Sequence, residues 1–310
     1  MEQVNVYSGD EVISRIFIEN GLDTLESCLA AYNRIYVVMD SNVAMNCPAA
    51  AEIAQILNRR GVPGMLIDAS EVSKNMSTVM NICGWLLDNG ADRDALVLAV
   101  GGGITTDMVG FAASIYKRGV RFAYVPTTLL AQVDAGIGGK TGVNFDNYKN
   151  MLGVIRQPEF VYICPQVLRS LPHRDFCSGA AEMLKTFIIE DGGNYQKAAD
   201  LFFDISSEFT LEAHINGKDE GQVWKALMAK HKRTLAELIA AAARVKAGVV
   251  SRDQFERGER RKLNLGHTFA HAIETLAQQD GGERFNGHDG IQEVKGVTHG
   301  EAVAMGMVLA

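Results

Sequence analysis

Short apolar runs alternate with longer segments of helical spacing along the first half of the chain. Strands are predicted at 34–40, 63–68 and 95–100, and helices at 48–60 and 77–89. The run Ala-Leu-Val-Leu-Ala-Val at 95–100 is apolar throughout, as expected for a strand buried on both faces. The alternation predicts a parallel sheet flanked by helices.

The second half of the chain follows a different pattern. Beyond Leu168 the strand-like runs disappear, and alanine-rich helical periodicity predicts helical segments at 176–190, 223–250 and 265–277. Two segments rich in glycine and polar residues are predicted to be loops, at 192–221 and 278–298. The sequence therefore predicts an α/β domain with a parallel Rossmann-like sheet and an all-α domain, divided into 1–168 and 169–310, with the active site in the cleft between them.

Composition narrows the function classes. The 310 residues carry a net charge of -7, which argues against a nucleic-acid-binding surface, so an anionic ligand would need a local basic cluster. The five cysteines form no C-x-x-C pair, which is typical of a reducing compartment. The start of the chain has no secretory pattern, and no run reaches the roughly 18 apolar residues of a membrane span. We expect a cytoplasmic protein without a membrane partner.

A glycine-rich turn joins the strand at 95–100 to a helix. In Gly101-Gly-Gly-Ile-Thr-Thr-Asp107 the backbone amides and the helix N-terminus can face a pyrophosphate without Cβ obstruction. A plain tight turn is the alternative. The pattern is not G-x-G-x-x-G, and no acid follows about twenty residues on to bind a ribose. Asp40, at the end of an earlier strand, is the better candidate for the ribose.

The segment 125–144 is dense in hydroxyl groups and glycines. Gly138-Gly-Lys140-Thr141 is similar to part of a phosphate loop, but the first glycine of that motif falls on Asp134, which excludes a nucleotide triphosphatase. A lysine beside flexible backbone still suits a phosphate or carboxylate. Nearby cations at Lys149 and Arg118 have the same potential, although any one of them is more often a solvated surface cation.

Two histidines one helical turn apart are candidate metal ligands, although such a pair is a surface coincidence about as often. His267 and His271 share a helical face, and His299 follows downstream. The zinc-protease motif H-E-x-x-H is excluded, because a threonine follows His267. Glu182 lies among apolar residues of a predicted helix, where a carboxylate is costly unless it is paired. One glutamate and two histidines would leave open positions for a substrate, as a catalytic zinc site does.

These segments together resemble the 3-dehydroquinate synthase family. The shared motifs are the triple glycine followed by Asp107, Pro-Thr-Thr-Leu-Leu-Ala-Gln-Val-Asp, Gly-Gly-Lys-Thr-Gly-Val-Asn, Lys-Asn-Met, Leu-Pro-x-Arg, Gly-x-Ala-Glu-x-x-Lys, Leu-Asn-Leu-Gly-His-Thr-Phe-x-His and His-Gly-Glu-Ala-Val. They occur in the family's order from about Glu71 to the end of the chain.

The resemblance implies a lyase of the shikimate pathway, which leads to chorismate and the aromatic amino acids. Such enzymes convert the phosphorylated sugar acid 3-deoxy-D-arabino-heptulosonate 7-phosphate to 3-dehydroquinate and phosphate. The implied steps are transient oxidation by NAD, phosphate elimination, reduction and intramolecular aldol closure. The resemblance also implies one divalent metal ion, zinc or cobalt, and a homodimer.

The resemblance also implies the site residues. The NAD site would be formed by Asp40, Asn42, Glu71, Lys74, Gly102, Gly103, Ile104, Asp107, Thr127 and Thr128. The metal ligands would be Glu182, His267 and His299. The substrate pocket would be lined by Arg118, Asp134, Lys140, Lys149, Asn150, Lys185, Lys246, Arg260, Asn264 and His271, whose cations supply the local basic cluster.

Two features depart from the family pattern. The connection between His271 and His299 is longer than usual, so the glycine-rich segment 281–290 is expected to be an inserted loop whose His288 is not a metal ligand. Family members usually continue for several helices beyond the position of Ala310, so we expect this chain to lack that part.

Three other interpretations stay open. A sister cyclase of the 2-deoxy-scyllo-inosose synthase type would differ in substrate preference, and Arg260 and Asn264 favour the dehydroquinate type. A metal-dependent glycerol or alcohol dehydrogenase would accumulate NADH. An inactive binding or scaffold protein would fail to bind NAD or zinc.

Overall fold

The computed structural model describes residues 2–146, 148–281 and 296–310. In this part of the chain, seven strands form one sheet in the order β1-β2-β9-β6-β5-β3-β4. β1 and β2 are antiparallel, and every other neighbouring pair is parallel. The strands are β1 Glu2–Ser8, β2 Glu11–Ile18, β3 Ile35–Asp40, β4 Gly64–Ile67, β5 Leu96–Gly101, β6 Arg121–Pro126 and β9 Phe160–Ile163.

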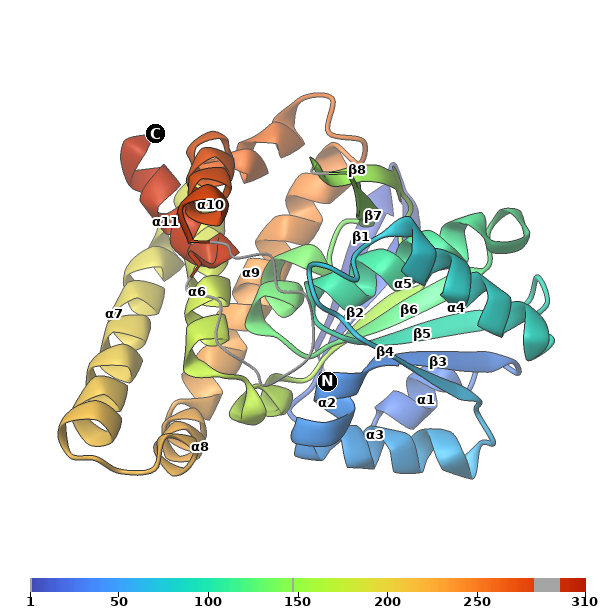
Figure 1. The fold of residues 1–310 in the computed structure, drawn as a ribbon, viewed down its shortest axis with the longest axis horizontal. Helices are drawn as coiled ribbons and strands as arrows, with labels where there is room; N and C mark the ends of the chain where they lie inside the picture. The colour runs from blue at the N-terminus through green and yellow to red at the C-terminus, as the bar shows by residue number, and fades with distance from the viewer. Residues whose placement is uncertain (1, 147, 282–295) are drawn as a thin grey trace.

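Helices cover both faces of this sheet (Figure 1), with α4 and α5 on one side and α1 and α3 on the other. These helices are α1 Leu25–Leu29, α2 Ser41–Asn46, α3 Pro48–Arg59, α4 Met76–Asp88 and α5 Gly103–Ile115. The predicted strands and helices of this half agree with the observed ones to within one or two residues. The parallel α/β architecture is therefore confirmed.

Two hairpins were not predicted. β1 and β2 form an edge hairpin through Gly9, whose φ of 60° suits the tight connection. The second hairpin pairs β7 Lys140–Phe145 with β8 Tyr148–Ile155 outside the main sheet. Its two strands carry three predicted substrate residues, Lys140, Lys149 and Asn150.

The remainder of the described chain is helical. Its helices are α6 His173–Ile189, α7 Gly192–Phe209, α8 Glu220–Lys230, α9 Lys232–Arg252, α10 His267–Gly281 and α11 His299–Leu309. Short helical turns add η1 Tyr116–Arg118, η2 Ala131–Ala135, η3 Pro165–Ser170, η4 Thr210–Ile215 and η5 Glu259–Asn264. No helix in the described ranges is long and apolar enough to cross a membrane.

The loop prediction for 192–221 is wrong. The segment forms α7 and η4, because its apolar residues recur at helical spacing and are buried along one face, at Ala198, Leu201, Phe202, Ile205 and Phe209. The glycines that suggested a loop lie only at its ends. The helical segment predicted at 223–250 is also two helices, which are separated at His231.

The loop predicted at 278–298 is only partly described. α10 continues to Gly281, so the first residues of that segment are helical. Residues 282–295, and with them His288, lie outside the described residues.

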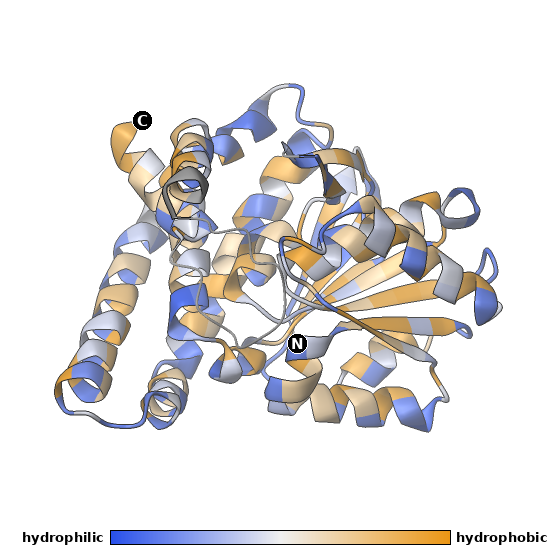
Figure 2. Ribbon diagram, in the orientation of Figure 1, coloured by the Kyte–Doolittle hydropathy of each residue, from blue (hydrophilic) through white to orange (hydrophobic). Residues whose placement is uncertain are grey.

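Buried apolar residues of both halves form one continuous cluster, which extends from Val6 in β1 to Val250 in α9. Figure 2 shows the apolar strands enclosed by helices whose outer faces are polar. A separate small cluster, built around Ala270, Ala302 and Val303, joins α10 to α11. The division into two domains at 168 and 169 stays a prediction, because the shared cluster crosses that boundary.

Candidate active site

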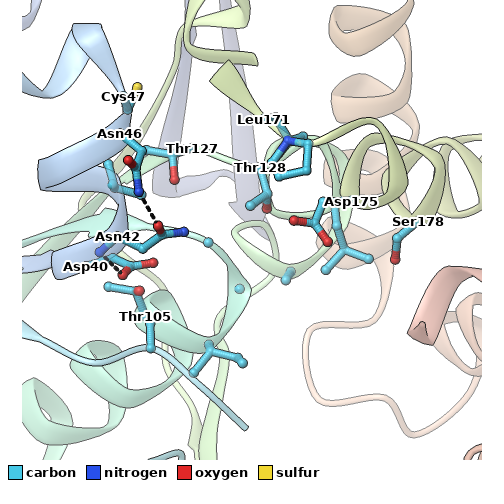
Figure 3. A pocket seen from close by; sticks show the side chains of 18 of the residues that line it. Asp40, Asn42, Asn46, Cys47, Thr105, Thr127, Thr128, Leu171, Asp175 and Ser178 are labelled. Atoms are coloured by element: carbon cyan, nitrogen blue, oxygen red, sulfur yellow. Dashed lines mark hydrogen bonds between the residues drawn. The ribbon is translucent and has the colours of Figure 1, made fainter. Parts of the chain in front are cut away.

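A cavity of about 420 Å³ opens at the carboxyl ends of β3, β5 and β6 (Figure 3). It is lined by all ten predicted NAD residues: Asp40, Asn42, Glu71, Lys74, Gly102, Gly103, Ile104, Asp107, Thr127 and Thr128. In open α/β sheets, ligands bind at this end of the strands, and pockets of this size accept small molecules. The cavity is also lined by Thr105, Asp175 and Ser178, for which the sequence analysis gave no role.

The glycine-rich turn leaves its backbone open to this cavity. Gly102 is the N-cap of α5, so the first amides of that helix lie beside the cavity. A Cβ on Gly102 would stand 3.0 Å from the Thr128 side chain, and one on Gly103 would stand 3.1 Å from Ala135. The hydroxyl of Thr127 is buried without a hydrogen-bond partner among the described atoms. Free amides and an unpaired hydroxyl fit the phosphate and amide groups of a dinucleotide.

Asp40 and Lys74 are the two charged groups of the cavity whose hydrogen bonds bear most on its use. The Asp40 carboxylate accepts a hydrogen bond from the Asn42 backbone at 2.9 Å, and burial raises its pKa. The Lys74 ammonium donates to Asp107 Oδ2 and to Asn150 Oδ1, each at 2.6 Å. Because Asn150 belongs to β8, Lys74 connects this cavity to the hairpin.

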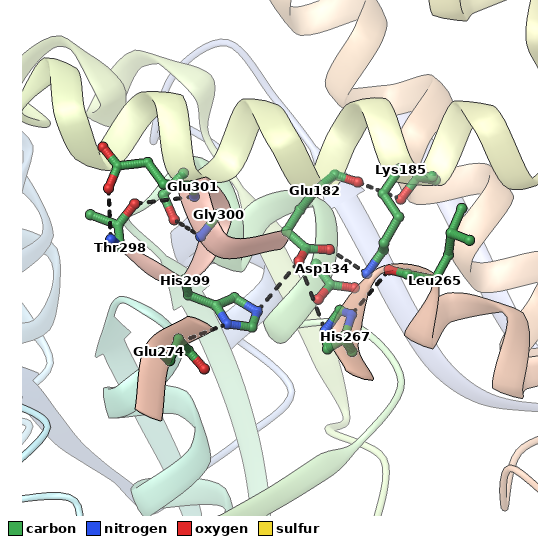
Figure 4. Close-up of polar contacts among 12 residues, drawn as sticks. Asp134, Glu182, Lys185, Leu265, His267, Glu274, Thr298, His299, Gly300 and Glu301 are labelled. Atoms are coloured by element: carbon green, nitrogen blue, oxygen red, sulfur yellow. Dashed lines mark hydrogen bonds and ion pairs between the residues drawn. The ribbon is translucent and has the colours of Figure 1, made fainter. Parts of the chain in front are cut away.

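Glu182, His267 and His299 come together from α6, α10 and α11 (Figure 4). One ligand atom of each lies within 4.8 Å of the others, and the Glu182 Oε1 to His299 Nε2 distance is 3.4 Å. The donors of a tetrahedral zinc site stand roughly 3.4 Å apart, since each bond is about 2.1 Å. Small side-chain shifts would therefore suffice to bind a metal, and the predicted trio fits zinc or cobalt.

A chain of opposite charges continues from this trio. Glu182 is fully buried and forms an ion pair with Lys185. Asp134, on the turn η2, forms an ion pair with Lys246 from α9. Burial opposes the charged form of Asp134, but the ammonium groups of Lys246 and Lys185 hold its pKa well below its usual range. Burial lowers the pKa of Lys246 to about 8.

A second cavity, of about 550 Å³, adjoins the first and shares Asp107 and Ala135 with it. Eight of the ten predicted substrate residues line it: Asp134, Lys140, Asn150, Lys185, Lys246, Arg260, Asn264 and His271. The predicted metal ligand His267 also lines it. The two cavities and the metal trio therefore meet at one place.

Two predicted substrate residues lie apart from this cavity. Lys149 Nζ contacts Glu274 Oε1 at 3.2 Å instead. Arg118 lines a different surface hollow with Asp92 and Asp94, so this single chain does not bring it to the others. It has a φ of 70°, in the turn η1.

Arg260 is the largest fully buried side chain among the described residues. It donates to Gln254 O at 2.6 Å and to Gly138 O at 2.8 Å, and its Nε has no described partner. Burial lowers its pKa, although an arginine stays charged. A charged guanidinium beside the basic cavity suits an anionic ligand.

Besides Asp175, two acidic residues of the site were not predicted. Glu256 accepts from Lys140 and Asn264, at 2.6 and 2.7 Å, and so holds two predicted substrate residues. No motif marks it in the sequence. Glu274 contacts His299 and Lys149, and it follows His267 and His271 at helical spacing, so periodicity offered a signal for it.

The fold and the site together fit one class: an enzyme with a cavity suited to a dinucleotide, a Glu-His-His trio suited to a metal ion and a basic pocket suited to an anionic substrate. Comparison of the sequence with models of protein families identifies the family. The 3-dehydroquinate synthase N-terminal model matches residues 64–178, and the C-terminal model matches residues 179–310. The chain belongs to the 3-dehydroquinate synthase family.

Curated relatives agree with this assignment. The 3-dehydroquinate synthase of Alkaliphilus metalliredigens is 37% identical over 96% of this chain and 73% of its own length. That of Halorhodospira halophila is 38% identical over 98% of this chain and 72% of its own length.

Solved structures add two sister cyclases. A 2-deoxy-scyllo-inosose synthase in complex with carbaglucose-6-phosphate, NAD+ and Co2+ is 27% identical, with a TM-score of 0.72 over 99% of this chain and 75% of that one. The 2-epi-5-epi-valiolone synthase of Streptomyces hygroscopicus, with NAD+ and Zn2+, is 30% identical, with a TM-score of 0.73 over 99% of this chain and 76% of that one. A probable glycerol dehydrogenase from Sinorhizobium meliloti, 17% identical with a TM-score of 0.56, shares the fold alone.

Proposed function

We propose that this chain converts 3-deoxy-D-arabino-heptulosonate 7-phosphate to 3-dehydroquinate and phosphate, as a metal- and NAD-dependent lyase. The observation that carries the proposal is the meeting of three subsites. Asp107 and Ala135 form the wall between the dinucleotide cavity and the basic cavity, and His267 of the metal trio lines the basic cavity. A substrate held there would face a hydride acceptor and a Lewis acid together.

Asp40, Lys74, the Gly102–Gly103 turn and Thr127 would hold NAD, and Glu182, His267 and His299 would hold the metal. When bound, NAD supplies reversible hydride transfer, and the metal supplies Lewis-acid polarisation of a substrate hydroxyl group. The cyclase cycle regenerates NAD in each turnover, so no net NADH is produced.

The residues of the basic cavity would bind and orient the substrate. Lys140 and Asn150 would bind the phosphate, together with Lys149, which lies on the same hairpin. Arg260 and Lys246 would bind the anionic ends through charged donors, and arginine adds a planar fork. His271 and Asn264 would orient the ring oxygens. These residues would hold the leaving phosphate while the opened product turns toward ring closure.

The assignment is tested with metal-loaded protein, NAD and the heptulosonate phosphate, following phosphate and dehydroquinate in parallel. Release of both that stops with a chelator, without net NADH, supports the proposal. Accumulating NADH would instead support a dehydrogenase. Turnover of glucose 6-phosphate but not of the heptulosonate phosphate would support the sister cyclase, whereas a folded protein that binds neither NAD nor zinc would support a scaffold.

We further propose a cytoplasmic homodimer. The resemblance supports the dimer, and the scattered free cysteines support a reducing compartment. In a dimer, Arg118 would lie near a second copy if its surface hollow took part in the interface. Sedimentation velocity on the wild type measures the oligomeric state. The same measurement on Arg118→Glu shows whether Arg118 contributes to the dimer interface.

A further inference from the structure

Glu274 is a buried carboxylate that has no role in the function proposed above. It lies on the helical face of α10 that also carries His267 and His271, and its side chain is only 7% exposed. A buried carboxylate is costly unless hydrogen bonds and opposite charges compensate for its lost hydration. Its partners therefore indicate why it is there.

A single oxygen of Glu274 contacts two elements across the site. Oε1 lies 3.3 Å from Nδ1 of His299 on α11, and 3.2 Å from Nζ of Lys149 on β8 (Figure 4 shows Glu274 and His299). On its other side, the His299 ring presents Nε2 to Glu182 Oε1 at 3.4 Å. Glu274 thus connects the hairpin, α10 and the first residue of α11.

The two nitrogens of the His299 ring face different carboxylates: Nδ1 faces Glu274 and Nε2 faces Glu182. When Nδ1 donates its hydrogen to Glu274, Nε2 is the nitrogen left to bind a metal ion held between His299 and Glu182. Metal-binding histidines commonly donate their second nitrogen to a carboxylate, which fixes the ring and makes it a stronger ligand. The same oxygen forms an ion pair with the Lys149 ammonium of the hairpin.

We propose that Glu274 is a positioning residue that orients His299 for the metal and, through Lys149, ties the β7–β8 hairpin to the metal centre. The proposal rests on the metal site of the proposed function. The first part of the proposal, the orientation of His299, requires only that Glu182, His267 and His299 bind a metal ion. It can therefore be tested whatever the substrate is.

The test measures metal affinity without turnover. Metal-free protein is titrated with Zn2+ in competition with a chromophoric chelator, and with Co2+ by visible absorption. Glu274→Leu keeps the volume but removes the acceptor, and it should weaken Zn2+ binding by roughly 10- to 100-fold and alter the Co2+ spectrum. Glu274→Gln keeps an acceptor oxygen and should recover most of the lost affinity.

Two further variants separate the two contacts. Lys149→Met should leave the Zn2+ affinity unchanged and raise KM for the sugar phosphate more than it lowers kcat. Thr275→Ala is the matched control on α10, because among the described residues that hydroxyl bonds only to the His271 carbonyl, at 2.8 Å. It should match the wild type in metal affinity.

Wild-type Zn2+ affinity in a folded Glu274→Leu protein would overturn the proposal. So would a Glu274→Gln variant as weak as Glu274→Leu, since the acceptor would then not be the cause. If Glu274→Leu does not fold, Glu274→Met takes its place and must show the same loss. Failure of turnover in a protein with the expected metal affinities would refute the proposed reaction and leave this inference intact.

Discussion

Glu182 and Lys185 form an ion pair one helical turn apart on α6, and their side chains are 0% and 1% exposed. Burying two charges costs more than their attraction usually returns, so such a pair seldom exists for stability alone. Burial and the neighbouring Asp134 oppose the charge on Glu182, but Lys185 and His299 lower its pKa. The pair therefore keeps a carboxylate charged where a metal ion needs one.

The two histidines of α10 should differ sharply in their importance for the metal. His267 belongs to the trio, whereas the ring of His271, whose centroid is 5.8 Å away, lies outside it. His267→Ala should weaken Zn2+ binding at least about 100-fold, since a direct ligand outweighs a supporting contact. His271→Ala should keep the metal and raise KM. Chelator competition and steady-state kinetics measure the two effects, and equal metal losses would contradict this assignment.

Lys246 should set the alkaline limit of activity. Burial lowers its pKa from the usual 10.5 to about 8, so above that pH the neutral amine no longer attracts an anionic substrate. We expect kcat/KM to fall with an apparent pKa near 8. In Lys246→Arg the guanidinium stays charged, so this decline should disappear even if the rate is lower. An unchanged alkaline decline in that variant would assign it to another group.

Loss of the Lys246 proton should lower the activity but raise the free energy of unfolding. Between about pH 8 and 10.5 the folded chain loses the Lys246 proton while the unfolded chain keeps it. The free energy of unfolding therefore gains a positive contribution as the pH rises through this window. Urea unfolding across the window, compared between the wild type and Lys246→Met, isolates that contribution.

The sequence predicts the α/β half well because its signals are local. The strand at 95–100 is apolar at every position, and the glycine-rich turn directly follows it, so burial and turn chemistry agree. α7 was missed for the converse reason. Its terminal glycines resemble loop signals, whereas its stability comes from packing one apolar face, including Leu201 and Ile205, onto the core.

The site also contains residues that local sequence signals reveal and residues that they do not. Motif residues such as Glu182, His267 and His299 could be named from the sequence, but their meeting point depends on how α6, α10 and α11 pack. Glu256 has no motif and acts only through Lys140 and Asn264, which approach it in space. Local sequence patterns carry no information about contacts between distant segments. Sequence analysis therefore misses residues, such as Glu256, that act by holding other site residues in place.

Gly300 should be required for tight metal binding although it is not itself a metal ligand. Its amide donates to Ser178 Oγ at 3.0 Å, and a Cβ there would lie 2.2 Å from the Ser178 carbonyl oxygen. Gly300→Ala should push α11, with His299, away from α6, destabilise the fold by about 1–3 kcal/mol and weaken Zn2+ binding. Gly84→Ala is the matched control, since nothing lies within 4 Å of its Cβ position on α4.

The two glycine variants should change the stability in opposite directions. Gly84→Ala should raise the stability by about 0.5–1 kcal/mol, because alanine loses less backbone entropy in a helix, and should leave the metal affinity unchanged. Thermal unfolding and Zn2+ titration report both quantities. A Gly300→Ala protein with wild-type metal affinity would show that the close contact between α11 and α6 is not required.

Asp40 should determine which dinucleotide is accepted. Its carboxylate follows β3 at the wall of the cofactor cavity, where it would bind the ribose hydroxyls of NAD and repel the extra phosphate of NADP. Asp40→Ser removes the charge but keeps a side chain that can cap α2, so folding should be preserved. NAD affinity should fall about tenfold, because a charged hydrogen bond is lost, while NADP binding should improve. Fluorescence titration with both nucleotides measures the ratio, and a parallel loss of both affinities would place the ribose elsewhere in the cavity.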